Sequence, residues 1–336
     1  MIACIISIDY EIYGNGAGSL RELVYEPAER LRTLFREHAK RFVPFVEAAE
    51  LEMIEAEGSD DGLRLVRKQL RELYHDGFEI GLHLHPQWYN GRTVEGIWRL
   101  DYGEYNLCTL PRARISELVH RGIGYFQGVL GAPDFVPFSF RAGNWLLQPT
   151  ANVAAALSEA GIRVDSSVFK GGLLRQHHVD YRGARENGYY WSFSEDVVVP
   201  DPNGVLLEIP ICTRMVPFWR MATAKRIGLQ NKGRAGHRGP EKTPSRLSDL
   251  LRFRYPLKLD FCRMGREELT SAIDAIARDD RSSPGTFKPI VAIGHTKDLT
   301  DLATVESFLL YLRKTQIEVV TFADAYARCS RDARSN

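Results

Sequence analysis

Apolar runs typical of buried strands alternate with amphipathic stretches along the chain, the pattern expected when helices cover a mostly parallel sheet or barrel. The apolar runs predict strands near residues 2–9, 42–46, 78–84, 136–141, 162–165, 205–211, 289–294 and 317–320. Helical periodicity predicts helices over 27–39, 62–76, 112–130, 149–160, 266–279 and 300–314. Pro27, Pro111 and Pro149 suit a first helical turn, and Gly161 suits a helix end. About seven β-α units therefore predict an α/β chain of barrel-like architecture.

Residues 86–110 interrupt this rhythm with aromatic side chains among glycines and polar groups. The aromatic residues are Trp88, Tyr89, Trp98, Tyr102 and Tyr105. A loop of this kind is typical of a lid or a substrate wall, and surface aromatics in a folded loop are an equally good interpretation.

Residues 219–258 form a second interruption, rich in basic side chains with Gly and Pro in the middle. The basic residues are Arg220, Lys225, Arg226, Lys232, Arg234, Arg238, Lys242, Arg246, Arg252, Arg254 and Lys258. The simpler interpretation is a mobile, solvated insertion, and the sharper one is an arm that meets a phosphate-bearing substrate or an anionic membrane surface. We expect one domain over 1–325 that carries both interruptions, followed by a tail over 326–336.

Composition narrows the class of protein only moderately. The chain has 336 residues, 44% hydrophobic and 26% charged, as in an ordinary globular protein. A net charge of +1 argues against a general nucleic-acid-binding surface. The five cysteines are scattered without CxxC spacing, which favours a reducing compartment over a disulfide framework or a thiolate zinc site.

The apolar runs are also too short for targeting or for membrane insertion. Residues 1–9 lack a basic leader and a cleavage site, so they predict a strand and not a signal peptide. No later run approaches the roughly 20 apolar residues of a membrane span. We therefore expect a cytoplasmic protein that at most contacts a membrane peripherally.

The candidate chemistry begins with two histidines at the exit of one predicted strand. His83 and His85 lie two residues apart, so in an extended segment both imidazoles point the same way and can bind one metal ion. Pro86 then ends the strand and turns the chain into a loop. A single histidine is more often an ordinary surface or core residue than a metal ligand. Two histidines on the same face of a strand make a pair of metal ligands more credible.

Two carboxylates end the first predicted strand in the same way. Asp9 and Glu11 would project from one face, where a cation between them would offset their repulsion. At a strand end they could also be ordinary surface acids. Their position at the same end of a parallel sheet as the histidines favours a shared site, since sites in such folds lie at the carboxyl ends of strands.

Three further strand ends also deliver an ionisable residue. Arg141 follows Phe138-Ser139-Phe140, Asp165 follows Ile162-Arg163-Val164, and His295 follows Ile290-Val291-Ala292-Ile293-Gly294. One such residue could be a helix cap or an ion pair. Five strand ends of this kind predict an active site.

In this order, the motifs resemble those of the polysaccharide deacetylase family, the NodB-type carbohydrate esterases. Glu79-Ile80-Gly81-Leu82-His83 is similar to the lead into the family's histidine motif, and Asp9-Tyr10-Glu11 to its acidic pair. Phe140-Arg141, Val164-Asp165-Ser166-Ser167 and Gly294-His295 follow in family order, so the resemblance runs from residue 2 to about 325.

This resemblance implies a distorted (β/α)7-like barrel and a metal-dependent hydrolysis of a sugar N-acetyl group. It implies one divalent ion, with zinc as the expected species, held by Glu11, His83 and His85. The remaining implied roles are those of a general base (Asp9), a general acid (His295) and two residues that orient them (Arg141 and Asp165, respectively). The substrate would be an N-acetylated sugar of a surface-polysaccharide precursor such as that of an O-antigen or a capsule.

The sequence departs from the family between the two histidines. The family pattern places three residues between them, whereas only Leu84 separates His83 from His85, and Gln87 takes the later position. Either His85 or Gln87 could complete the metal site, and a neutral amide is the poorer ligand. A degenerate metal site in a barrel that only binds sugar is a third possibility.

Two alternatives stay open at this point. Amidohydrolases and metallophosphoesterases also use His-x-His with carboxylates, although in amidohydrolases this motif usually follows the first strand. A non-catalytic carbohydrate-binding barrel would bind sugar without metal. Trp88 and Trp145 are candidates for stacking on sugar rings, with packing an equally good interpretation.

Overall fold

The computed structural model describes residues 1–186, 189–221, 223, 225–229, 253–282 and 284–335. Its helices are α1 (Glu26–Glu37), α2 (Ala48–Glu57), α3 (Leu63–His75), α4 (Arg112–Leu130), α5 (Ala151–Glu159), α7 (Arg266–Ser282), α8 (Leu302–Lys314) and α9 (Phe322–Ser335). The strands up to the middle of the chain are β1 (Ile2–Tyr10), β2 (Val43–Glu47), β3 (Gly81–Leu84), β4 (Arg92–Val94), β5 (Ile97–Arg99), β6 (Ser139–Ala142) and β7 (Val164–Asp165). The later strands are β8 (Leu173–Leu174), β9 (Val179–Asp180), β10 (Trp191–Phe193), β11 (Leu206–Glu208), β12 (Thr213–Val216), β13 (Tyr255–Lys258), β14 (Lys288–His295) and β15 (Glu318–Val319).

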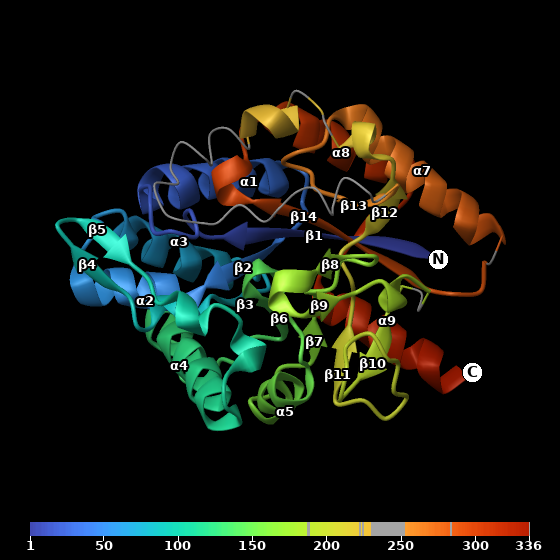
Figure 1. Ribbon diagram of the computed structural model, residues 1–336. Coiled ribbons are helices and arrows are strands. Elements are labelled where there is room, and N and C mark those ends of the chain that lie inside the picture. The colour runs from blue at the N-terminus through green and yellow to red at the C-terminus, as the bar shows by residue number, and fades with distance from the viewer. Residues whose placement is uncertain (187–188, 222, 224, 230–252, 283, 336) are drawn as a thin grey trace.

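A curled sheet forms the centre of the molecule, with helices on its outer side (Figure 1). Its strand order is β10-β11-β7-β6-β3-β2-β1-β14, with β15 also paired to β1. These strands are parallel except for the antiparallel pair β10–β11. An isolated parallel bridge from Ile211, just after β11, to β14 brings the two sides of the sheet together, and a second bridge ties Asp260, just after β13, to β14. The predicted α/β class and barrel-like architecture are thus confirmed.

Burial explains why the strands were recognisable in the sequence. All residues of β1 from Ala3 to Tyr10 are buried, because β2 and β14 flank the strand and helices cover the sheet. A strand buried on both faces has a continuous apolar run, and β1 and β14 both show one. Every predicted strand and helix has a counterpart whose ends differ by a few residues.

Two helices were not predicted from the sequence. α2 begins at Ala48, directly after β2, so no glycine or proline marks the change from strand to helix. The buried Glu47 starts the helix, since its side chain accepts hydrogen bonds from the backbone N–H groups of Ala49 and Glu50. α9 begins before the expected tail and covers residues 326–335 of it, and its buried Phe322, Ala325 and Cys329 pack on the core.

The two interruptions also have a place in the fold. Residues 86–110 contain the hairpin of β4 and β5 and several 3₁₀ turns. β12 and β13 form an antiparallel pair on either side of much of the basic stretch 219–258. Six of its basic residues lie outside the described residues: Lys232, Arg234, Arg238, Lys242, Arg246 and Arg252.

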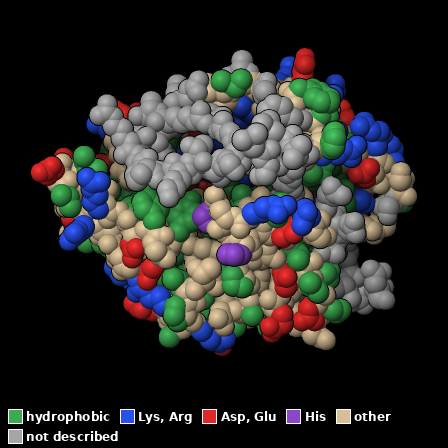
Figure 2. Space-filling model, viewed as in Figure 1, with side chains coloured by type: hydrophobic (Ala, Val, Ile, Leu, Met, Phe, Trp, Pro, Cys, Tyr) green, Lys and Arg blue, Asp and Glu red, His purple; other side chains and the backbone are tan. Residues whose placement is uncertain are grey.

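Charged side chains of both signs are interspersed on the face shown in Figure 2, in keeping with a net charge of +1. In the described part of the chain, no helix is both long enough and apolar enough to cross a bilayer. The described cysteines carry free thiols, and four of the five are buried.

Candidate metal centre

Parallel pairing brings the candidate residues to one end of the sheet. In the register, Asp9 on β1 lies opposite His295 on β14, and His83 on β3 lies opposite Arg141 on β6. Glu11 and His85 follow directly after β1 and β3. The strand ends therefore converge as the sequence predicts, apart from Asp165, whose contacts lie elsewhere.

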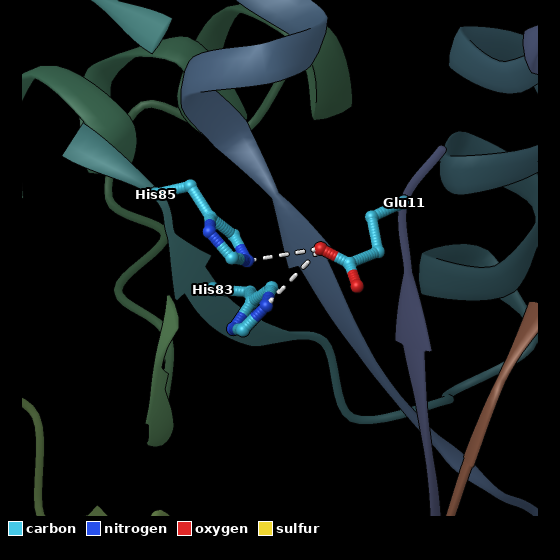
Figure 3. Close-up of side chains that lie close together, drawn as sticks. All are labelled: Glu11, His83 and His85. Carbon is cyan, nitrogen blue, oxygen red and sulfur yellow. Dashed lines mark ion pairs between the residues drawn. The ribbon is translucent and has the colours of Figure 1, made fainter. Parts of the chain in front are cut away.

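Glu11, His83 and His85 come together in a buried cluster (Figure 3). The Nε2 atoms of His83 and His85 lie 3.4 and 3.0 Å from the same oxygen, Oε2 of Glu11. Two atoms that each bind zinc at about 2.0–2.1 Å in tetrahedral geometry lie roughly 3.3 Å apart. One carboxylate and two imidazoles at this spacing fit a divalent metal ion.

The second ring nitrogen, Nδ1, of both His83 and His85 also has a polar partner. Nδ1 of His83 lies 2.7 Å from the backbone oxygen of Arg141, so it donates its hydrogen there and leaves Nε2 as the ligand atom. Nδ1 of His85 lies 3.2 Å from the Gln87 amide and 3.3 Å from that of Asn144.

Gln87 therefore supports His85 and does not replace it. Its side chain is fully buried, and its Oε1 has no hydrogen-bond partner among the described residues. Exchanging the amide oxygen and nitrogen would let Oε1 accept a hydrogen from Nδ1 of His85, leaving Nε2 free to bind metal. Of the two candidates for the third ligand, the geometry favours His85.

Lys297 is part of the cluster, although its position in the sequence does not distinguish it from other lysines. Its Nζ lies 2.7 Å from Oε1 of Glu11 and 2.9 Å from the backbone oxygen of Ile12. Burial alone would raise the pKa of Glu11, but Lys297 and the two histidines hold it well below its usual value. Lys297 thus keeps Glu11 ionised and leaves Oε2 to face the histidines.

A buried ion pair lies beside the cluster. Nη1 of Arg141 is 2.5 Å from Oδ1 of Asp9, and the same guanidinium donates to Ser7 Oγ and to the backbone oxygen of Ser166. Burial alone would raise the pKa of Asp9, but the charges of Arg141 and the nearby histidines lower it overall. Asp9 is therefore an ionised carboxylate within reach of the same site.

His295 faces Asp9 from the other side. Its Nε2 lies 3.4 Å from Oδ2 of Asp9, and its Nδ1 lies 3.9 Å from Oδ2 of Asp298. Burial lowers the pKa of His295 to about 4, so the ring is neutral near pH 7. Arg263 binds the same Asp298 oxygen at 2.6 Å.

Asp165, expected to orient His295, has different partners. Its two carboxylate oxygens accept hydrogen bonds from the backbone N–H and the hydroxyl of Ser167, and its side chain also bonds to Glu208. Ser167 Oγ in turn accepts the backbone N–H of Ala142 at the end of β6. Asp165 thus supports the strand that carries Arg141, and Asp298 is the acidic group on the Nδ1 side of His295.

The two tryptophans selected for sugar stacking differ in environment. Trp88 is 1% exposed and packs against Trp98 with ring centroids 4.9 Å apart, so in this structure its faces are not open to a sugar. Trp145 is only partly buried, and its ring meets His295 edge-on at 5.7 Å. Trp145 is therefore the one next to the candidate acid–base group.

No family model and no curated protein matches this chain. Solved structures do, and they define the fold as that of the polysaccharide deacetylases. A protein from Mycobacterium smegmatis described as a polysaccharide deacetylase matches at a TM-score of 0.54 with 13% identity, covering 98% of this chain and 91% of its own. One from Pseudomonas aeruginosa PAO1, described likewise, matches at 0.53 with 14% identity, covering 99% and 90%.

The same fold also serves other reactions. A branching enzyme from Pyrococcus horikoshii matches at a TM-score of 0.54 with 12% identity, covering 96% of this chain and 69% of its own. At such identities the comparisons confirm the predicted deacetylase-type barrel, and function has to be argued from the side chains.

Gly143 offers a test of the position of His85. A Cβ there would lie 2.5 Å from the backbone oxygen of Leu84 and 2.9 Å from Cγ and Nδ1 of His85. We expect Gly143→Ala to displace the ring and to weaken zinc binding at least about tenfold, as loss of support around a ligand does. Calorimetric zinc titration measures this. Gly128→Ala, where a Cβ meets nothing within 4 Å, is the control, and equal affinities would contradict the close packing.

Glu208 offers a test of the buried acid pair. Burial and Asp165 raise the pKa of Glu208 well above its usual value, so the folded protein holds a proton that the unfolded chain releases. This stability is complete below the unfolded pKa and is lost as pH rises through the folded one, at up to about 1.4 kcal/mol per pH unit.

Glu208→Gln carries a neutral donor at every pH. We therefore expect its free energy of unfolding to gain on the wild type as the pH rises above about 4.3, the pKa of an ordinary Glu, in denaturant titrations. Glu159→Gln, at an exposed side chain, should follow the wild type. Parallel profiles for Glu208→Gln and the wild type would show that the pair holds no extra proton.

Proposed function

We propose that this protein is a metal-dependent hydrolase that removes an N-acetyl group from a sugar. The observation that carries the proposal is the convergence of Glu11, His83 and His85, with ligand atoms within 4.8 Å of one another, beside the Asp9–Arg141 pair and His295. The polysaccharide deacetylase fold supports the same reaction class.

Glu11, His83 and His85 would hold one divalent ion, for which zinc is our proposal because imidazole and carboxylate are ligands it accepts. When bound, the ion would polarise the acyl oxygen and make a water molecule more acidic. Their burial and the hydrogen bonds on Nδ1 of both histidines keep these side chains oriented for that purpose.

Asp9 would take a proton from the attacking water. Arg141 binds its Oδ1 and leaves Oδ2, which lies 3.4 Å from Nε2 of His295. The water oxygen adds to the acyl carbon, and the C–N bond then breaks as the leaving nitrogen gains a proton. His295, neutral at the start, would carry that proton from Asp9 to the amine, so that acetate and a free amino sugar result.

The substrate we propose is a sugar of a surface-polysaccharide precursor, reached in the cytoplasm, with peripheral membrane contact as an option. Free thiols at all five cysteines suit a reducing compartment. Two cations of the basic stretch already form ion pairs with the barrel: Lys225 with Asp301 and Arg226 with Glu268.

Metal content tests the proposed centre. We expect about one divalent ion per chain after incubation with zinc, lost in His83→Ala and in His85→Ala, because each removes a ligand. Gln87→Ala should retain zinc with roughly 10- to 100-fold lower affinity, since it removes only the support of His85. Elemental analysis after dialysis measures the content, and the exposed His120→Ala is the matched control. A metal-free wild type would favour the sugar-binding barrel instead.

Acetate release tests Asp9. We expect Asp9→Asn to lower kcat by on the order of 10²–10⁴, the contribution of a general base, in a protein that is less stable but still folded and still binds zinc. Release of acetate from N-acetylated saccharides is the measurement, with the exposed Asp134→Asn as control. Full activity in Asp9→Asn would remove the role assigned to this carboxylate.

A further inference from the structure

Lys258, at the end of β13, is placed beside the site by the strand pair that brackets much of the basic stretch. Its Nζ lies 3.0 Å from the ring centroid of Trp145 and 4.4 Å from that of Phe169. Within the described ranges, no carboxylate oxygen lies within 4.0 Å of this ammonium and no acceptor takes a hydrogen bond from it. The ammonium is therefore held by two aromatic faces without a counter-ion.

The other cations around the site already have anionic partners. Arg141 binds Asp9, Lys297 binds Glu11 and Arg263 binds Asp298, each at 2.7 Å or less. Lys258 differs from all three. Burial, followed by the charge of Arg263, lowers the pKa of Lys258 to about 7, because the opposing charges of Asp260 and Asp9 do not offset these two effects.

Trp145 connects Lys258 to the proposed chemistry. The ammonium of Lys258 lies over one face of the Trp145 ring, and the ring packs edge-on against His295 at an interplanar angle of 83°. Asn144 and Trp145 both have left-handed backbone angles, φ 55° and 58°, which are unusual for residues with a side chain. Strain of this kind is found at functional sites, where the surrounding fold fixes an otherwise unfavourable position.

The indole N–H of Trp145 is a second unused donor. Nε1 is buried and has no hydrogen-bond acceptor among the residues that the structure describes. In the part of the chain that the structure describes, the ammonium has no counter-ion within 4.0 Å and the indole N–H has no acceptor, and a negatively charged oxygen could satisfy either donor.

We propose that Lys258 binds an anionic group of the substrate, a carboxylate or a phosphate, next to the acetamido group that is hydrolysed. The inference rests on the proposed function and narrows it to negatively charged sugars. Lys258 acts as a specificity residue, because a charge-assisted contact in a partly desolvated site discriminates strongly against neutral sugars.

Calorimetric binding to the zinc-loaded protein tests the inference without requiring turnover. The probes are N-acetylglucosamine, its 1-phosphate and its uronic acid, so that the phosphate and the carboxylate are compared separately. We expect one of the anionic probes to bind at least about tenfold tighter than the neutral sugar. Lys258→Gln should lose this preference and keep the neutral affinity, and Lys258→Arg should retain most of it.

Lys68→Gln, at an exposed lysine, is the matched control. An equal loss of neutral and anionic binding in a folded Lys258→Gln would mean that the lysine only supports Trp145, and this overturns the inference. So would a wild type without preference, or a preference that survives in Lys258→Gln.

Acetate release separates this inference from the proposed function. Equal turnover of neutral and anionic sugars, together with equal binding, contradicts the role of Lys258 and leaves the deacetylase proposal intact. Tight, Lys258-dependent binding of an anionic sugar without release of acetate from any probe contradicts the deacetylase proposal and leaves the role of Lys258 intact.

Discussion

The ion pair of Asp9 and Arg141 is the interaction on which the site depends most. The Arg141 side chain is fully buried, and its guanidinium joins β1, β6 and the segment after β7 through Asp9, Ser7 and Ser166. Breaking a buried pair by removing one partner leaves an uncompensated charge and costs about 3–5 kcal/mol. A fold that tolerates such a pair at its centre has to supply the hydrogen bonds that satisfy both groups, and these bonds fix the strand ends that carry the other residues.

Further buried polar contacts extend from this pair toward the sheet edge. Ser167 joins the end of β6 to Asp165, and Asp165 in turn shares a proton with Glu208. On the metal side, the backbone oxygen of Arg141 sets the ring nitrogen that His83 uses as a ligand. Arg141 therefore holds Asp9 through its side chain and orients His83 through its backbone oxygen, so the proposed base and the proposed metal ligand are coupled through one residue.

The sequence was sufficient to predict the sheet and the converging residues, because both follow from local rules. Continuous apolar runs mark strands buried on both faces, and polar residues at their carboxyl ends must meet when the strands are parallel. Contacts set by side-chain reach were not predictable. Asp165 and Asp298 are both plausible partners for His295 in the sequence, and only the path of the chain after β14 places Asp298 there. Lys297 and the start of α2 at Glu47 were not predicted either, because no residue spacing or motif in the sequence marks them.

One fold that serves proteins described as deacetylases and a branching enzyme leaves the chemistry to the side chains at its strand ends. In this chain the acids and histidines come from β1, β3 and β14, which belong to the shared barrel. Lys258 comes instead from the antiparallel pair β12–β13, outside the main sheet. In the proposed assignment, substrate choice and bond cleavage would therefore depend on different parts of the molecule. Because β12–β13 is a separate two-stranded sheet, the sugar bound in this assignment could change without disturbing the Asp9–Arg141 pair that the proposed catalytic residues need.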